Sequence, residues 1–289
     1  MKYDITMIGH ISKDIMIYNN KEVRFTGGPV IYSSAAASRA GKKVQIITKA
    51  SNDCEEELSA VRDSGVAVIR IDSEKTTSIK NVYFTPDRER REVTLISQAD
   101  PFTEKDIPDS ESRIYHLAGL FRGEIPDTLI PFLSEKGNVA VDAQGLLRCS
   151  EHGNLVFRDW EKKEEYLPLI SFFKTDAAEA QIMTGEKDRE KAAVKLSSWG
   201  AEEIMVTHNS EVLVLSKGKF YRAPFNPRNL SGRTGRGDTA FAAYIAWRLD
   251  HDEDESVRFA AALCSIKMES PGPFSGTVSD VFSRMETIP

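Results

Sequence analysis

Apolar runs that alternate with helical patterns constrain the fold of this 289-residue chain more than any other feature. Residues 3–9, 43–49 and 66–71 are typical of buried strands, and segments with helical signals lie between them. The alternation resumes after residue 112, with further strands expected at 114–117, 139–141, 171–174 and 203–206. Such alternation predicts a parallel sheet with right-handed crossovers. We therefore expect an α/β fold, and a single domain of this length can bury a large core.

One segment interrupts the alternation. Residues 76–83 and 92–96 have the period of strands and flank the charged turn 87–91. Together with residues 15–26, this hairpin is expected to form a small sheet that stands off the main domain as a lid. An ordinary surface hairpin explains the same pattern, and the sequence leaves both interpretations open.

The chemistry of the chain is concentrated in the stretch Thr234-Gly235-Arg236-Gly237-Asp238-Thr239, which precedes the apolar run 240–247. Two glycines allow the backbone to expose consecutive N–H groups where a helix begins, and the positive end of that helix attracts an anion. Asp238 would repel a phosphate there, so its presence indicates a base that accepts a proton. The combination is typical of phosphoryl transfer.

Two other interpretations fit this stretch. Gly235 to Ala240 also fits the GxGxxA dinucleotide fingerprint of a dehydrogenase, but it lies late in the chain, and no strand ending in an acid follows about twenty residues on. A plain surface loop that caps a helix is the other alternative.

Composition narrows the classes of partner. A formal net charge of -6 disfavours binding to nucleic acid, because the negatively charged phosphates of nucleic acid bind to basic surfaces. The apolar runs are shorter than a membrane span needs, and the N-terminus does not resemble a signal peptide, so we expect a cytoplasmic protein without a membrane partner. Three distant cysteines and five scattered histidines predict neither disulfides nor a zinc site.

Further candidate residues follow predicted strands or open helices. Asp14 follows the first strand, where α/β proteins bind ligands, and either grips substrate hydroxyls or simply forms a turn. Gly27-Gly28 precedes a helix of small residues and allows a ligand to touch the backbone. Asp176 and Glu179 lie on one helical face, which capping alone also explains.

Taken in order, these motifs resemble the ribokinase or PfkB family of sugar kinases. Gly27-Gly28 matches the family's diglycine, and Gly235-Arg236-Gly237-Asp238 matches its GAGD loop with Arg in place of Ala. The resemblance extends to Asp14, the hairpin, Asp176-x-x-Glu179, Thr207 and Pro271-Gly272. It implies a three-layer αβα ribokinase-like fold with a mostly parallel central sheet. It further implies one kinase domain over 1–289, with a small β lid formed by roughly 12–26 and 74–98.

The resemblance also implies roles for individual residues. Asp238 matches the catalytic base, and the amides of Gly235, Arg236 and Gly237 match the anion hole for the γ-phosphate. Positions that bind the acceptor are Asp14, Ser12, Gly27, Gly28 and Tyr32, with Asn81 and Gln144 assigned from their position only. The nucleotide-binding positions are Asp176, Glu179, Thr207, Thr234 and Ala261, and Glu179 is expected to hold Mg²⁺ through water.

The sequence departs from the family pattern at residues that bear on the choice of substrate and on the binding of ions. Ser12 and Tyr32 replace asparagines of ribokinase-like sequences, which disfavours a furanose pocket. Gly232 replaces a carboxylate linked to monovalent-cation binding, so dependence on potassium stays open. Residues 207–212 replace the adenine-side TxGxxG, which leaves the nucleotide preference open as well.

A narrower resemblance is to prokaryotic myo-inositol kinases. It is carried by residues 9–14, 99–103, 142–145, 158–160 and 232–238. It predicts ATP-dependent transfer of a phosphoryl group to a cyclic polyol, with myo-inositol as the expected acceptor and Mg²⁺ as cofactor. The alternatives are a kinase of a nucleoside or another sugar, and a non-catalytic ligand-binding regulator. A homodimer that covers the edges of the lid is also compatible with the sequence.

Overall fold

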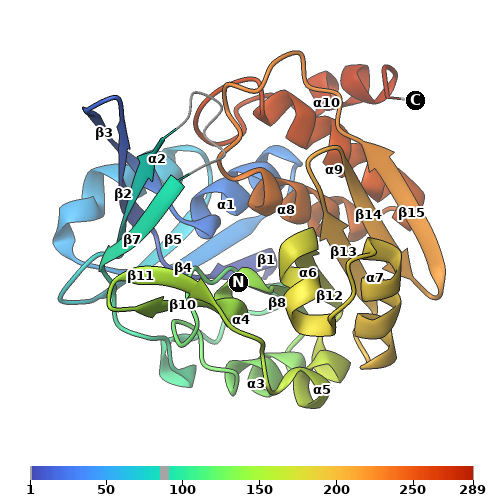
Figure 1. The fold of residues 1–289 in the computed structure, drawn as a ribbon, viewed down its shortest axis with the longest axis horizontal. Helices are drawn as coiled ribbons and strands as arrows, with labels where there is room; N and C mark the ends of the chain where they lie inside the picture. The colour runs from blue at the N-terminus through green and yellow to red at the C-terminus, as the bar shows by residue number, and fades with distance from the viewer. Residues whose placement is uncertain (1, 85–90, 289) are drawn as a thin grey trace.

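A nine-stranded sheet forms the centre of the computed structural model, which describes residues 2–84 and 91–288 (Figure 1). The strands follow the order β15-β14-β13-β12-β9-β8-β1-β4-β5. Their bounds are β1 (Tyr3–Ile8), β4 (Val44–Ala50), β5 (Ala67–Asp72), β8 (Ser112–Leu117), β9 (Asn138–Asp142), β12 (Phe172–Asp176), β13 (Glu203–Thr207), β14 (Glu211–Ser216) and β15 (Lys219–Pro224). All neighbours from β13 to β5 are parallel, whereas β14 and β15 are antiparallel.

Helices cover both faces of this sheet, and each face has its own apolar core. One core contains residues of α1 (Pro29–Arg39), α2 (Glu55–Asp63), α8 (Arg236–Arg248), α9 (Glu253–Lys267) and α10 (Val278–Met285). The other contains residues of α3 (Leu129–Ser134), α4 (Gln144–Leu147), α5 (Lys163–Tyr166), α6 (Ala177–Thr184) and α7 (Arg189–Ser198). Short 3₁₀ turns lie at Asn52–Cys54, Glu104–Asp106 and Leu167–Leu169. The expected three-layer αβα fold with a mostly parallel sheet is confirmed.

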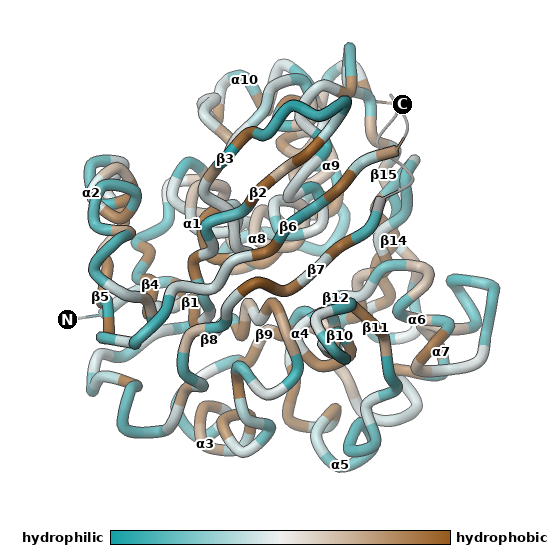
Figure 2. The backbone as a smooth tube through the Cα atoms, turned by 60° about the vertical axis from the view of Figure 1, so that its left-hand side comes forward, coloured by the Kyte–Doolittle hydropathy of each residue, from teal (hydrophilic) through white to brown (hydrophobic). Residues whose placement is uncertain are grey.

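A second sheet of six strands lies beside the main body, in the order β10-β11-β7-β6-β2-β3 (Figure 2). Its strands are β2 (Ser12–Tyr18), β3 (Lys21–Gly27), β6 (Ser78–Tyr83), β7 (Arg91–Ser97), β10 (Arg148–Glu151) and β11 (Asn154–Phe157). The first four match the segments expected from sequence, with β3 ending one residue beyond its segment, although residues 87–90 of the charged turn lie outside the described residues. The hairpin of β10 and β11 was missed. Its turn at His152-Gly153 has positive φ at both residues, which suits a two-residue hairpin.

The register of the small sheet determines which side chains face the body. Asp14 and Met16 lie on one face of β2, and Met16 pairs with Asn81 of β6, so Asn81 shares that face. Ile79, two residues before Asn81, packs against Phe121 of the main body. Asp14 and Asn81 therefore lie on the inner face of this sheet.

Glu124 fastens the end of the first strand to the loop under the small sheet. Its carboxylate, fully buried, accepts hydrogen bonds from the main-chain N–H groups of His10 (2.7 Å), Leu120 (2.8 Å) and Phe121 (3.3 Å). A buried carboxylate is tolerated when several donors satisfy it. In the described part of the chain, no helix has the length and apolar character needed to cross a membrane.

Candidate active site

The start of α8 needs glycine at position 235 for two reasons. Gly235 caps the helix with φ 77°, a left-handed conformation that favours glycine. A Cβ there would also lie 2.3 Å from Cδ1 of Tyr32, so the aromatic ring rests directly on this turn. The first N–H groups of a helix have no acceptor within it, which leaves those of Gly237 and Asp238 for a ligand. The amide of Arg236, expected in the anion hole, instead donates to the carbonyl of Arg233 at 3.2 Å.

Asp238 lies in this first turn and is only partly accessible to solvent. Burial, and next the negative charge of Asp142, raise the pKa of Asp238 to about 6, against the opposing charges of Lys174, Arg148 and Lys267. A carboxyl with such a pKa is ionised at neutral pH yet basic enough to take a proton. The hydroxyl of Ser33 donates to the Asp238 carbonyl at 3.3 Å and ties α1 to this turn.

Lys174 on β12 was missed by the sequence analysis. Its ammonium lies 3.0 Å from both carboxylate oxygens of Asp142 and 3.9 Å from Oε2 of Glu179. A Cβ added to Gly237 would lie 3.1 Å from Lys174 Nζ, so the ammonium sits against the first turn of α8. Burial lowers the pKa of Lys174, but the carboxylates of Asp142 and Glu179 outweigh it, and the net shift is upward. The sequence offered one indication of a buried lysine, because Lys174 directly follows two phenylalanines in an expected buried strand.

Asp176 and Glu179 form a capping box at the start of α6. Asp176 Oδ1 accepts from the amide of Glu179 at 2.8 Å, and Glu179 Oε2 accepts from the amide of Asp176 at 2.8 Å. Burial raises the pKa of Glu179 to about 7, opposed by Lys174. Within residues 2–84 and 91–288, no group of three or more His, Cys, Asp or Glu could hold a metal ion. One or two carboxylates suffice for Mg²⁺ when phosphates supply the other ligands, so these residues fit that mode of binding.

On the opposite side of the site, Ser12 and Asp14 of β2 surround Gly27. A Cβ at Gly27 would lie 2.6 Å from Asp14 Oδ2 and 3.0 Å from Ser12 Oγ. Ser12 Oγ is buried and has no hydrogen-bond partner among the described residues. Burial raises the pKa of Tyr32 well above its usual range, and the charges of Asp238 and Asp14 add to this. The charges of both carboxylates therefore act on the Tyr32 hydroxyl, while its ring rests on the start of α8.

Three other predicted residues lie around the same region. Gln144 accepts a hydrogen bond from Arg148 Nη2 at 2.7 Å, and so orients a cation whose charge acts on Asp238. Asn81 is buried on the inner face of the small sheet. At Gly28, φ is 97° and a Cβ would lie 2.4 Å from the carbonyl oxygen of His10, so only glycine fits. The roles of these residues toward an acceptor stay predictions.

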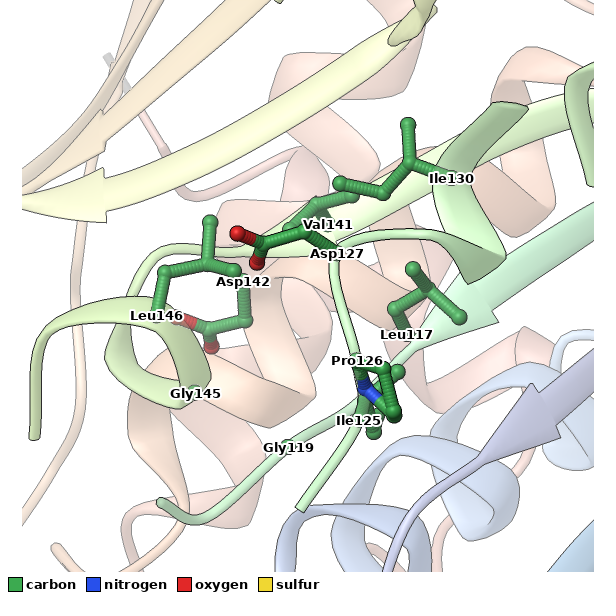
Figure 3. A pocket seen from close by; sticks show the side chains of 10 residues that line it. All are labelled: Leu117, Gly119, Ile125, Pro126, Asp127, Ile130, Val141, Asp142, Gly145 and Leu146. Atoms are coloured by element: carbon green, nitrogen blue, oxygen red, sulfur yellow. The ribbon is translucent and has the colours of Figure 1, made fainter. Parts of the chain in front are cut away.

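Two hollows border residues of the site without reaching Asp238. A recess of about 10 Å³ on the α3 side has space for at most one water (Figure 3). It is lined by Leu117, Gly119, Ile125, Pro126, Asp127, Ile130, Val141, Asp142, Gly145 and Leu146. A larger hollow of about 580 Å³ borders the small sheet, and Asp14 lines it together with Lys13, Asp53 and Glu57. Asp238 lines neither, so the cluster of charged groups defines the candidate site.

The family model of the pfkB family carbohydrate kinases matches residues 1–279. The chain belongs to this family. It is therefore a phosphotransferase, and the family and enzyme class expected from sequence are confirmed.

Several individual relatives are similar to most of the chain. A pyrophosphate-dependent kinase in the ribokinase family, solved with a pyrophosphate analog and myo-inositol, is 40% identical and has a TM-score of 0.89, over 96% of this chain and 99% of that one. The cytidine kinase of Thermococcus kodakarensis is 25% identical over 95% of this chain and 99% of its own length. The inositol 3-kinase of Arabidopsis thaliana is 24% identical over 83% of this chain and 67% of its own.

Three residues that were predicted to contact a nucleotide lie in different environments. Thr207 ends β13 beside Asp176, its register partner, and is almost fully buried. Thr234 is exposed, and its carbonyl accepts a hydrogen bond from Lys267. Ala261 is fully buried within α9, among the residues of the core. It has no accessible surface, and its expected contact with a nucleotide stays a prediction.

Proposed function

We propose that this kinase transfers a phosphoryl group from pyrophosphate to a hydroxyl of myo-inositol, with Asp238 as the general base. One observation carries the proposal: the Tyr32 ring rests on Gly235 at the anion-attracting start of α8, and the charges of both Asp238 and Asp14 act on its hydroxyl. A phosphate at α8 and an alcohol held by Asp14 would thus meet beside Asp238.

The chemistry follows from these positions. The acceptor hydroxyl gives its proton to the Asp238 carboxylate as its oxygen bonds to the transferred phosphorus, and the bond to the leaving phosphate breaks. The free N–H groups of α8 and the Lys174 ammonium stabilise the charge on the transferred group. Mg²⁺, when bound, would neutralise charge on the donor oxygens, and Asp176 and Glu179 are the residues that would hold it.

Two observations support pyrophosphate in place of the ATP expected from sequence. The 40% identical structure is described as a pyrophosphate-dependent kinase. In addition, Arg236 reaches from α8 to the loop after β13, where it donates to Asn209 Oδ1 at 2.9 Å. The family resemblance places the adenine of a nucleotide beside this loop. A guanidinium at that place favours a compact, highly charged donor without a nucleoside. ATP is the second candidate, since two ribokinase structures with a similar fold were solved with ATP.

The residues predicted to bind the acceptor favour a polyol as the substrate. Ser12, Asp14 and Asn81 of the small sheet and Tyr32 of α1 offer hydroxyl, carboxylate and amide groups, which suits a ring with many hydroxyls. A nucleoside remains the second candidate because the cytidine kinase relative extends over 95% of this chain.

The proposal is tested with purified protein, Mg²⁺ and ³¹P NMR. We expect pyrophosphate and myo-inositol to yield an inositol monophosphate and orthophosphate in equal amounts, faster than ATP with myo-inositol or either donor with cytidine. Asp238→Asn should reduce kcat about 100-fold to 10,000-fold while the protein stays folded, because the proton acceptor is lost. Asp63→Asn, at an exposed position of α2, is the matched control and should have no effect. Turnover with cytidine alone, or undiminished activity of Asp238→Asn, would contradict the proposal.

A further inference from the structure

Lys267 is a buried ammonium that the mechanism above does not use. It is the last residue of α9, and only 3% of its surface is exposed. Its Nζ donates to the carbonyl oxygen of Gly232 at 2.5 Å and to that of Thr234, and it lies 5.1 Å from the centre of the Tyr32 ring. Two main-chain carbonyls and an aromatic face therefore converge on one positive charge.

These groups are the ligands that a bound monovalent cation uses. Rings of main-chain carbonyl oxygens coordinate potassium in proteins, and aromatic faces attract cations. Gly232 also stands where the family pattern has a carboxylate linked to monovalent-cation binding. Here an ammonium attached to α9 occupies the centre of the carbonyl pair, so a free ion and Lys267 cannot occupy it together.

The carbonyls belong to the segment that leads directly into the phosphate-binding turn. This segment is held against the end of α9: the amide of Gly232 donates to Met268 O at 2.8 Å, and a Cβ at Gly232 would lie 1.8 Å from Ser270 O. Gly235 follows one residue after Thr234, and its neighbours Gly237 and Asp238 supply the free amides and the base. A displacement of the Thr234 carbonyl would thus move the groups that face the phosphoryl group.

A purely structural role for Lys267 is the simpler interpretation. However, burying an ammonium costs more free energy than filling the same space with an apolar side chain. Burial lowers the pKa of Lys267 to about 8, so its charge is retained at neutral pH against a desolvation penalty. An apolar side chain would cover Tyr32 without that penalty, yet it would leave two inward-pointing carbonyls unsatisfied.

We propose that Lys267 is a tethered monovalent cation: it holds the Gly232 and Thr234 carbonyls so that the start of α8 faces the phosphoryl group, and it makes the kinase independent of free potassium. Lys267 is thus a positioning residue. The inference rests on the proposed role of the α8 turn, but not on the identity of donor or acceptor.

The first experiment measures wild-type turnover with tetramethylammonium, which is too large for the site, as the only monovalent cation, and again with KCl, NaCl or NH₄Cl. We expect less than about a twofold difference between the salts. Strong stimulation of the wild type by potassium would overturn the proposal, and this arm does not depend on any variant.

The second experiment compares Lys267→Ala, which opens a space beside the carbonyls, with Lys267→Met, which fills it without charge. In tetramethylammonium, both should lose about 10-fold to 100-fold in kcat with little change in acceptor KM, because the amides facing the transition state are displaced. NH₄⁺ or K⁺ should restore Lys267→Ala and not Lys267→Met. The matched control, Lys187→Ala, removes an exposed lysine and should behave as the wild type.

A third measurement separates this inference from the proposed function. K⁺ should raise the melting temperature of Lys267→Ala above its value in equal tetramethylammonium, and it should leave Lys267→Met unchanged. This readout needs no turnover, so it stays informative if neither pyrophosphate nor myo-inositol is a substrate. Equal melting temperatures and equal activities of Lys267→Ala in every salt would refute the inference.

Discussion

Substitution of Gly235 by alanine isolates the contact between the α8 turn and Tyr32. Gly185, which ends α6, has nearly the same backbone conformation, with φ 79° against 77° at Gly235. An added Cβ meets nothing within 4 Å at Gly185, whereas at Gly235 it would lie 2.3 Å from the Tyr32 ring. Gly185→Ala therefore measures the cost of the left-handed conformation alone, and Gly235→Ala measures that cost plus the displacement of the ring.

The magnitudes follow from these geometries. A left-handed alanine costs about 1 kcal/mol once the loss of unfolded-state entropy is counted. Forcing the buried ring to move adds about 1–3 kcal/mol. A chain of this length gains about 0.6 kcal/mol/K of entropy on unfolding, so 1 kcal/mol lowers the melting temperature by about 2 °C. We expect a decrease of about 2 °C for Gly185→Ala and about 3–7 °C for Gly235→Ala.

Activity should separate the two variants further. Displacement of Tyr32 disturbs the region between Asp14 and Asp238, so Gly235→Ala should lose at least about tenfold in kcat/KM, while Gly185→Ala should keep the wild-type value. Thermal unfolding followed by circular dichroism, and phosphate release under saturating donor, provide both readouts. If the two alanine variants lose the same stability and keep the same activity, the argument that the ring rests on the turn is refuted.

Three further predictions concern charged groups. Because Asp238 must be ionised to accept a proton and its pKa is raised to about 6, kcat/KM should rise with pH through that value and level off above it; a pH profile that is flat from pH 5 to pH 8 would contradict this. Lys174→Met leaves the buried Asp142 carboxylate without its ammonium and should lower the free energy of unfolding by about 3–5 kcal/mol in urea titrations, part of which the double variant with Asp142→Asn should recover. Glu124→Gln replaces one acceptor oxygen by an amide donor that faces main-chain N–H groups, and a loss of about 1–3 kcal/mol is expected in the same assay; unchanged stability would show that the bonds of Glu124 are dispensable.

The sequence predicted those features that depend on local pattern. The alternation of strands and helices predicted the parallel sheet, because right-handed crossover connections allow only a few arrangements of the strands. Gly235 and Gly27 were found because each belongs to a pair of nearby glycines at the start of an expected helix, and in the structure a Cβ at either position would collide with a neighbouring side chain. The diglycine and the α8 turn lie far apart in sequence; in the structure Gly27 lies against Asp14, and Gly235 lies against the ring of Tyr32.

Features that depend on strand order or on long-range register were not accessible. Lys174 and Asp142 are register partners on the parallel strands β12 and β9, so their ion pair exists only once those strands are adjacent. Lys267 ends a helix whose apolar pattern gave no sign of a buried ammonium. The hairpin of β10 and β11 carries Arg148 into the site, but its strands are only four residues long and lack a strong turn signal.

The six-stranded sheet is assembled from three separate hairpins, and each of them begins and ends at the main body. Asp14 belongs to the first, Asn81 to the second and Arg148 to the third. Evolution, or a protein engineer, can therefore exchange one hairpin at a time and alter what the enzyme accepts, while the helix that carries Asp238 keeps its sequence. Such modularity offers a physical route by which one ancestral scaffold diversifies toward unrelated alcohols.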